Sequence, residues 1–395
     1  MVKTRELYYE DAYIKSFQAK VVSCSEGKKG GFEIILDETC FFPEEGGQTS
    51  DVGILKTADG RAVKVSHVSI REGIVIHETD EAAKEGDTVY GEIDWDHRFS
   101  NMQQHTGEHI FSGIVSSRFG FDNVGFHLSD SEVTMDYSGV LSPEDIHDIE
   151  MAVNRAIWEN IPVKCEFPDA DTLKDMPYRS KKELTGDVRI VTIPGYDMCA
   201  CCAPHVARTG EIGILKVVGL QNYKGGVRVN ILCGKRALEA ICAEHDVVGS
   251  LMGMLTTSAD RLVTSVQKQA DENKSLKLKL SETEDRLIPY ELAQIDPELS
   301  DVFLVKSGDT SQGTIKKIVN ALVSGHDGYC GVFSGSDTEG YRYMIMTGSA
   351  GKDLKALQER LKNGFNARGG GNNAMIQGSI GAVKIQDIIE ELGRD

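Results

Sequence analysis

The stretch from Arg98 to Phe119, RFSNMQQHTGEHIFSGIVSSRF, contains two histidines. It separates a strand-rich region before it from a region of alternating helices and strands after it. Apolar residues recur along it at helical spacing, which predicts a helix with one apolar side. His105 and His109 lie four residues apart, so they share a stripe of that helix one turn apart. Two imidazoles placed in this way can bind one metal ion, and this helix is the first candidate for a functional element.

The residues before this helix are typical of antiparallel β-structure. Their strand-like runs are 16–24, 31–38, 62–70 and 73–80. Turn-forming residues separate the runs of each pair. Between the pairs lies CFFPEEGGQTSDVG, Cys40–Gly53, which contains too much proline and glycine for the interior of a strand. We expect a β-rich, barrel-like domain over residues 1–92.

Helices and strands alternate after the histidine helix. Ser142, Pro143 and Asp145 begin a second helix in the manner of a capped N-terminus. A buried strand, VRIVTIPG, then leads into CACCAPH, Cys199–His205. The pattern predicts an α/β domain over residues 93–245.

The region that follows is helical and then returns to α/β structure. Leu251–Leu287 fits a heptad grid that a few polar residues interrupt, so a helical connector is expected over 246–290. A helical hairpin and an intermolecular coiled coil both explain this grid, and the second would make the protein a homodimer. Residues 291–395 predict a compact α/β domain. The whole chain is therefore expected to have an α+β fold.

Composition limits the possible function classes. The net charge of −18 over 395 residues argues against a generally basic nucleic-acid binder, although residues 256–395 carry only −3 of it. Nine cysteines without an apolar leader indicate reduced thiols and a cytoplasmic protein. No apolar run approaches the roughly 18 residues that suggest a membrane span.

The cysteine-rich heptapeptide supplies the second half of a candidate metal site. Cys201 and His205 repeat the spacing of the two helical histidines, and thiolate with imidazole favours zinc over magnesium or calcium. Cys199 and Cys202 remain alternative ligands, and free cysteines are often only small buried apolar residues. Together the two halves predict one zinc ion per chain.

Three motifs in this order resemble a known family. CFFPEEGGQTSDVG, MQQHTGEHIFSG and CCAPHVARTGEIG are similar to the editing domain of alanyl-tRNA synthetase and to the freestanding AlaX proteins. The tail ARGGGNNAMIQGSIG resembles the glycine-rich end of the DHHA1 domain of that synthetase. The resemblance implies a long AlaX form, and it favours Cys201 as the thiolate ligand beside His105, His109 and His205.

The resemblance also implies a reaction. We expect zinc-dependent hydrolysis, in trans, of the ester of mischarged tRNA(Ala), with seryl-tRNA(Ala) as the main substrate and glycyl-tRNA(Ala) as a second one. Because only about ninety β-rich residues precede the histidine helix, we expect no aminoacylation activity. A single pocket separates such similar amino acids by only about 10²-fold, which explains the need for a second hydrolytic site. Thr39 and Gln48 are the residues that the resemblance assigns to substrate.

Two features depart from the expected pattern. Pro204 removes a backbone donor beside His205. Four protein ligands also suit a structural zinc site, whereas catalytic zinc usually keeps one position open. The sequence leaves open whether the ion activates water or only positions the substrate. Glu108 does not fit the HExxH order of a metalloprotease base, and we expect it to be a solvated helix residue.

Contacts to tRNA are less clearly marked. Basic clusters occur at 178–182, 222–228 and 234–236, and Arg228 is the candidate among them. Arg368 with Gly369, Gly370 and Gly371 is better placed, because exposed backbone N–H groups beside a guanidinium suit a phosphate. The rival functions are a non-catalytic tRNA-binding module with structural zinc and a DHH-type phosphoesterase, whose Asp-His-His motif this sequence lacks.

Overall fold

The computed structural model describes residues 3–27, 30–180, 187–348 and 352–393. The chain forms two compact units, Met1–Gly249 and Ser250–Asp395, each with its own buried apolar clusters. The mixed α+β class and the closed barrel that the sequence predicts are confirmed. Within the described ranges, every helix is too short or too polar to span a membrane.

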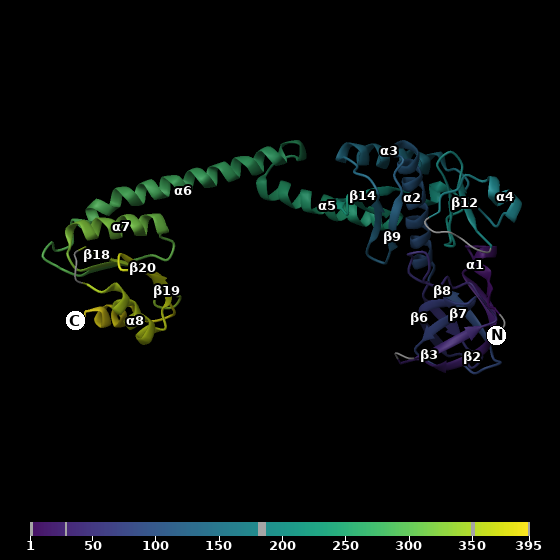
Figure 1. Ribbon diagram of the computed structural model, residues 1–395, viewed down its shortest axis with the longest axis horizontal. Coiled ribbons are helices and arrows are strands. Elements are labelled where there is room, and N and C mark those ends of the chain that lie inside the picture. Colours follow the sequence, from purple (N-terminus) through teal and green to yellow (C-terminus); the bar gives the residue numbers. More distant parts are fainter. Residues whose placement is uncertain (1–2, 28–29, 181–186, 349–351, 394–395) are drawn as a thin grey trace. The chain divides into compact units, whose positions relative to one another are not determined.

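The first unit begins with a closed barrel whose strands follow the order β2-β3-β7-β6-β5-β8 (Figure 1). Its strands are β2 Ser16–Glu26, β3 Phe32–Leu36, β5 Gly53–Lys56, β6 Ala62–Arg71, β7 Ile74–Thr79 and β8 Thr88–Ile93. Alternate side chains fill the interior, as the period of two requires. Glu72 and Gly73 both have positive φ, 52° and 77°, which matches the turn type that joins right-twisted strands such as β6 and β7.

A short parallel pair and a helix lie against the barrel. They are β1 Arg5–Glu6, β4 Glu38–Thr39 and α1 Leu7–Glu10. The loop after β4 is fixed by a fully buried ion pair, in which Arg98 binds both carboxylate oxygens of Asp51. Asp51 also accepts from the backbone N–H of Phe42, and Arg98 donates to the carbonyl of Cys40. This network attaches the loop to the first turn of the next helix.

That helix is α2, Trp95–Phe119, and it passes through the centre of the first unit. Asp94 caps its N-terminus, and Gly120 ends it with φ of 69°. Every residue from Asn101 to Val115 is buried. The predicted one-sided burial is therefore wrong, because strands and helix α3 surround α2 and cover its polar side as well.

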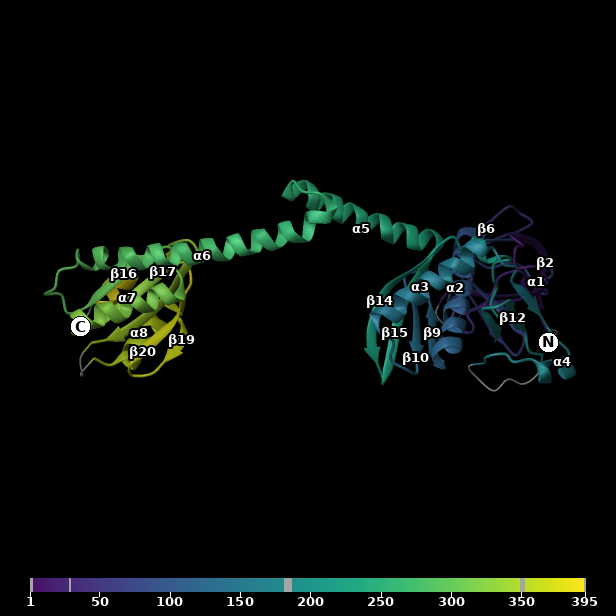
Figure 2. The same cartoon turned by 90° about the horizontal axis from the view of Figure 1, so that it is seen from above.

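Two further sheets of the first unit enclose α2 (Figure 2). One has the order β14-β15-β10-β9 and the other the order β11-β12-β13. Their strands are β9 Asn123–Leu128, β10 Val133–Tyr137, β14 Leu215–Tyr223, β15 Gly226–Cys233, β11 Lys164–Glu166, β12 Ile190–Ile193 and β13 Asp197–Ala200. The helices here are α3 Pro143–Glu159, α4 Ala170–Asp175 and the short η1 Thr209–Ile212. Helix α3 has the predicted cap, a reciprocal box between Ser142 and Asp145.

The predicted heptad grid crosses a break between helices. Helix α5, Gly234–Leu255, ends just before Thr256, which has φ of 48°. The short η2, Ala259–Arg261, leads into α6, Leu262–Leu292, so the two ends of the grid belong to different helices. Helix α6 contains Pro289 and continues to Leu292, two residues beyond the expected end of the connector at 290.

The second unit contains one sheet between two layers of helices (Figure 1). The order is β16-β17-β18-β20-β19, formed by β16 Val302–Lys306, β17 Tyr329–Ser336, β18 Gly340–Thr347, β20 Met375–Ile380 and β19 Arg368–Gly371. Its helices are α7 Gln312–Gly325, α8 Leu354–Phe365 and α9 Ile385–Leu392. Helix α7 packs with the cluster on one face, and α8 with α9 packs with the cluster on the other.

The glycine-rich tail differs from its expected form. It is an edge strand, β19, paired with β20, and not an open loop of free N–H groups. A Cβ at Gly369 or Gly371 would lie 2.2 Å from a carbonyl oxygen of β20. Glycine is needed at these two positions because the two backbones approach so closely.

Candidate metal centre

The structure brings the four predicted ligands together in the first unit. His105 and His109 project from α2, and Cys201 and His205 follow the end of β13. One candidate ligand atom from each residue lies within 4.8 Å of the corresponding atom of every other. All three histidines are at most 3% exposed. Segments about ninety residues apart in sequence thus form one buried cluster, which we call the His/Cys cluster.

Each imidazole of the His/Cys cluster is held through its Nδ1 atom. The three partners are Gln48 Oε1 for His105 at 2.8 Å, Asp197 Oδ2 for His109 at 3.0 Å and Thr106 Oγ1 for His205 at 3.0 Å. The Thr106 hydroxyl donates to the carbonyl of Met102, so it accepts from His205. Nδ1 is therefore the donor in each pair, and Nε2 is the nitrogen left to bind a metal ion. Oxygen partners of this kind are typical of histidines that bind metals.

The Nε2 atoms of two histidines lie close to the sulfur of Cys201. Nε2 of His105 is 3.5 Å from Sγ of Cys201, and Nε2 of His205 is 3.4 Å from the same sulfur. Burial alone would raise the pKa of the Cys201 thiol, but His105 and His205 outweigh it and hold that pKa well below its ordinary value. Burial lowers the pKa of His205 to about 3. Against the effect of burial, Asp197 and Cys201 hold the pKa of His109 well above its ordinary value. Metal binding requires the thiolate and the neutral imidazole, so an ion would have to displace a proton from His109.

The other two cysteines of the heptapeptide lie in different surroundings. Burial raises the pKa of Cys199, and burial together with Cys201 raises that of Cys202. Cys199 also belongs to a second possible group with His109 and Asp197. The electrostatics therefore favour Cys201 as the thiolate ligand.

Asp197 and Arg179 are parts of the site that the sequence did not indicate. Arg179 donates to both carboxylate oxygens of Asp197, at 2.7 and 3.0 Å, while Asp197 accepts from His109. Against the effect of burial, His109 and Arg179 lower the pKa of Asp197. An acidic residue four positions before Cys201 in a buried strand was the available signal. Arg179 was grouped with a basic surface cluster, and Lys181 and Lys182 of that cluster lie outside the described residues.

The expectation that Glu108 is solvated is wrong. This side chain is only 2% exposed, because α2 is covered on all sides. Its Oε1 accepts from Ser112 and Asn123, both at 2.6 Å, and its Oε2 is 4.0 Å from Nε2 of His109. A buried carboxylate therefore lies next to the His/Cys cluster.

Gln48 and Thr39 occupy different environments. Gln48 is fully buried, and the backbone around it pairs with β9 through Leu128, which brings its side chain to His105. Thr39 is buried in the barrel, where its Oγ1 is 2.9 Å from Nε2 of His77 and accepts from the N–H of Phe41. Nδ1 of His77 donates to a carbonyl and burial lowers the pKa of His77 to about 4, so the Thr39 hydroxyl donates to His77.

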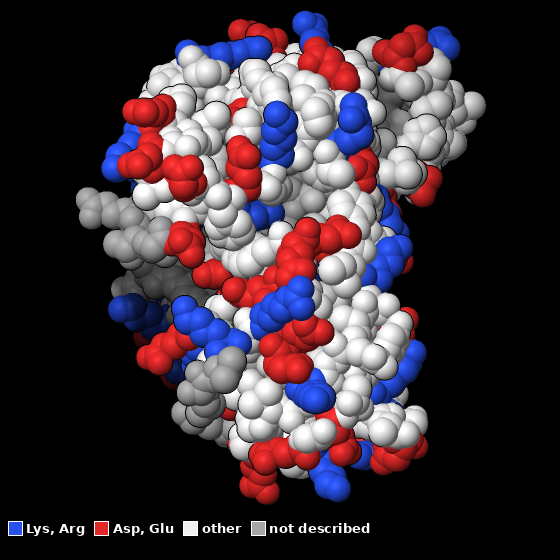
Figure 3. All heavy atoms as spheres, turned by 90° about the vertical axis from the view of Figure 1, so that its right-hand side faces the viewer, with Lys and Arg blue, Asp and Glu red and all other residues white. Residues whose placement is uncertain are grey.

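Arginines of the basic clusters in the first unit have protein partners. Arg228 forms a bidentate ion pair with Asp136, at 2.6 and 2.8 Å. Arg236 donates to Asn101 and to the carbonyl of Ser129. On the face of this unit that Figure 3 shows, acidic and basic side chains are interspersed. Arg368 in the second unit is exposed, so it is the better candidate for a phosphate contact.

Two families match parts of the sequence. Residues 2–97 match the family described as tRNA synthetases class II (A). Residues 188–230 match the Threonyl and Alanyl tRNA synthetase second additional domain. The second match contains Cys201 and His205, and the first contains the loop with Gln48.

Relatives that match longer stretches of the chain agree with these matches. The alanyl-tRNA editing protein AlaX-L of Pyrococcus horikoshii is 32% identical over 59% of this chain and 58% of its own length. The alanine–tRNA ligase of Pyrococcus furiosus is 30% identical over 81% of this chain and 36% of its own. That of Pyrococcus abyssi is 28% identical over 99% of this chain and 43% of its own.

The chain therefore spans less than two thirds of the length of each of these relatives. The two family matches, the order of the motifs and the AlaX-L relative show that this chain is similar to the AlaX-type editing proteins and to alanyl-tRNA ligase.

Proposed function

We propose that this protein is an aminoacyl-tRNA deacylase that hydrolyses the ester of mischarged tRNA(Ala) in trans. The single observation that carries the proposal is the His/Cys cluster, in which three held imidazoles and one thiolate converge next to the loop of Gln48. We also propose that the protein works in the cytoplasm and does not itself aminoacylate tRNA. The editing function named for AlaX-L supports the same reaction.

The donor set fits zinc. One thiolate and three neutral imidazoles suit this ion, and the Nδ1 partners orient the rings as metal ligands require. We propose one zinc ion per chain, held by His105, His109, Cys201 and His205. When bound, zinc would supply positive charge that polarises the ester carbonyl.

The chain's own residues position the ligands and the substrate. Gln48 uses its amide oxygen to hold His105, while its amide nitrogen is buried and has no hydrogen-bond partner in the described part of the chain. That N–H group is a donor for the ester or for the side chain of the misattached amino acid. An unpartnered donor at this depth is costly unless a ligand satisfies it.

To select serine over alanine, the site needs a polar group that binds the serine hydroxyl and has no partner when alanine is bound. Thr39 donates to His77 and accepts from Phe41, which leaves one lone pair on Oγ1. We propose that this lone pair accepts from the serine hydroxyl. Seryl-tRNA(Ala) is then the preferred substrate and glycyl-tRNA(Ala) the second.

In this proposal the chain consists of an editing part, a connector and a domain that binds RNA. Residues 1–92 and 93–245 form the editing part, 246–290 the connector and 291–395 a DHHA1-like domain that contacts tRNA through Arg368 and its glycines. Pairing of two chains through 251–287 is also proposed. Leu276, Leu280 and Leu287 on α6 are 66%, 57% and 52% exposed, which would suit such pairing.

One alternative has a specific observation in its favour. Four protein donors complete a tetrahedral zinc site, which is the arrangement of structural zinc. The protein would then bind tRNA without cleaving it.

Deacylation of purified substrates separates the two functions. Seryl-, glycyl- and alanyl-tRNA(Ala) are incubated with the full chain, release of amino acid is followed, and bound zinc is measured in the same samples. We expect rapid release of serine, slower release of glycine and little release of alanine. The His105→Ala, His109→Ala double variant should lose both zinc and hydrolysis. Wild-type protein that holds zinc and binds tRNA but releases no amino acid would support the structural alternative.

A further inference from the structure

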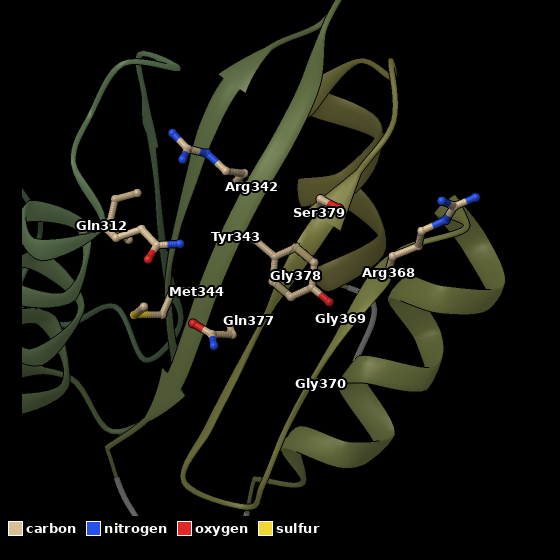
Figure 4. Close-up of a pocket in the computed structure, with 11 residues that line it drawn as sticks. Gln312, Arg342, Tyr343, Met344, Arg368, Gly369, Gly370, Gln377, Gly378 and Ser379 are labelled. Carbon is tan, nitrogen blue, oxygen red and sulfur yellow. The ribbon is translucent and has the colours of Figure 1, made fainter. Parts of the chain in front are cut away.

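A cavity lies in the second unit, on the face of the sheet that α7 partly covers. Figure 4 shows it between the first turn of α7 and the strands β18, β20 and β19. Its volume of about 420 Å³ falls within the range of roughly 300–1,000 Å³ that small-molecule sites occupy. We call it the α7 cavity.

The strand register places one cationic row in this cavity. Arg342 lies opposite Ser379, and Ser379 lies opposite Arg368, on three adjacent strands. Directly opposite residues project to the same face, so two guanidinium groups flank one hydroxyl. Neighbouring strands are about 4.8 Å apart, so the Cα atoms of the arginines are separated by roughly 10 Å. Guanidinium and hydroxyl groups in such a row bind phosphate.

A second row of different chemistry runs beside the first. Met344 lies opposite Gln377, and Gln377 lies opposite Gly370, two positions along each strand. The rows are therefore about 7 Å apart on the same face. Gln312 and Ile315 of α7 complete this side of the cavity. Apolar side chains and amides together suit the face and the edges of a nucleobase.

The charge of the cationic row is not neutralised within the cavity. None of the described residues that line it is acidic. Nη2 of Arg342 donates to the uncharged carbonyl of Gly308 at 2.6 Å. Both arginines are exposed. An anionic ligand would therefore find two uncompensated cations.

A buried tyrosine hydroxyl lies beside Gly378, which lines the cavity. This residue, Tyr343, is only 4% exposed, and its hydroxyl has no hydrogen-bond partner among the residues that the structure describes. A Cβ at Gly378 would lie 2.7 Å from this oxygen, so the ring occupies the space that glycine leaves open. Tyr343 packs with α8 and α9 on the opposite face of the sheet, so its hydroxyl does not face the α7 cavity and is not part of the ligand site.

We propose that the α7 cavity binds one nucleotide of RNA, with the phosphate on the row Arg342, Ser379 and Arg368 and the base over the row Met344 and Gln377. This inference rests on the proposed function, because mischarged tRNA supplies the RNA. It extends that function by assigning to the second unit a single-nucleotide site, in which the base contributes in addition to phosphate charge.

Gly370 allows the cavity to be filled without removing charge. A Cβ at this position meets no atom within 4 Å, and its row faces the cavity, so Gly370→Val would place a side chain in the site. Valine suits a strand, so β19 should persist. Arg368→Ala removes half of the cationic row instead. Lys355→Ala is the matched control, because it removes an exposed charge from α8 on the opposite face of the sheet.

The test measures binding of uncharged tRNA(Ala), of adenosine and cytidine monophosphates, and of the two nucleosides without phosphate to the full-length protein. We expect the monophosphates to compete with tRNA and the nucleosides to compete at least tenfold more weakly. Gly370→Val and Arg368→Ala should each weaken tRNA and monophosphate binding by tenfold or more, while Lys355→Ala changes either by less than twofold. Thermal unfolding of each variant shows whether it is folded.

Three results would overturn the inference. In the first, folded Gly370→Val and Arg368→Ala proteins bind tRNA as the wild type does. In the second, nucleosides compete as well as monophosphates. In the third, monophosphates bind but tRNA does not displace them, which would identify a free nucleotide as the ligand. Deacylation by the wild type at saturating seryl-tRNA(Ala) is measured separately. If the wild type releases no serine while Gly370→Val loses RNA binding, the deacylase function is refuted and the cavity assignment stands.

Discussion

The His/Cys cluster and the α7 cavity show two opposite ways of preparing a site. In the first, each imidazole is buried and its Nδ1 atom has an oxygen partner, so protein contacts fix the orientation of every ring. In the second, Arg342 and Arg368 are exposed and can reorient toward a flexible polyanion. Chemistry at one atom needs fixed groups in a dry site, whereas RNA affinity comes mainly from accessible charge.

This difference predicts different kinds of failure. Changes in the cluster should abolish metal binding and turnover and leave RNA affinity unchanged. Changes in the cavity should alter RNA affinity and its salt dependence and leave turnover at saturation unchanged.

The largest effect is expected for Cys201→Ala. Removing the only thiolate should eliminate zinc and reduce kcat by more than about 100-fold, because changes to the outer partners of metal ligands already cost roughly 10–100-fold. Zinc content and single-turnover hydrolysis of seryl-tRNA(Ala) measure it. Cys199→Ala and Cys202→Ala are the matched controls, and both should retain zinc. Loss of zinc in Cys202→Ala but not in Cys201→Ala would transfer the thiolate ligand to Cys202.

A smaller effect is expected for Asp197→Asn. The amide keeps an oxygen for Nδ1 of His109 but removes the charge that pairs with Arg179, so zinc affinity should fall by about 10–100-fold. Competition with a chelator gives the value. Asp136→Asn makes the same change in a bidentate pair with Arg228 and should leave zinc affinity unchanged. Equal losses in both variants would show that Asp197 acts only through the stability of the fold.

Most of the fold could be read from the sequence, because its signals are local. The four predicted strand-like runs form β2, β3, β6 and β7, and the predicted cap at Ser142 and Asp145 is present. Even the pairing of two distant motifs could be inferred, because thiolate and imidazole at metal-ligand spacing restrict the possible partners.

The errors arose where burial depends on distant segments. Glu108 looks exposed on a helical wheel, but strands later in the chain cover it. Asp197 and Arg179 carry no motif, since their roles depend only on meeting His109 in space. The glycines after Arg368 suggested a loop, whereas the nearby β20 backbone makes them a strand.

A further prediction tests whether part of the barrel belongs to the chemical site. Thr39→Val should lower the preference for serine over alanine by about 0.5–1.5 kcal/mol, the net value of one hydrogen bond. It should also destabilise the barrel, because the N–H of Phe41 and Nε2 of His77 lose a partner. Thr79→Val is the matched control, since this hydroxyl is also buried in the barrel and donates only to backbone carbonyls. If both variants lose stability and keep the same serine-to-alanine ratio, Thr39 is a structural residue.

The smallest change in slope, that of a single phosphate contact, is expected for Arg368 in the exposed cavity. Arg368→Ala should lower the slope of log affinity against log salt by about 0.7–0.9, the contribution of one phosphate contact, because it releases one counterion fewer. Arg368→Lys keeps the charge and should restore the slope, although it loses the fork that grips a phosphate. Titrations of labelled tRNA(Ala) at several salt concentrations provide the slopes, and zinc content should not change in either variant. Arg228→Ala is the informative partner: its guanidinium is already paired with Asp136, so it should leave the slope unchanged. A reduced slope in Arg228→Ala with none in Arg368→Ala would place the phosphate contact in the first unit, and the division between a chemical unit and a binding unit would no longer hold.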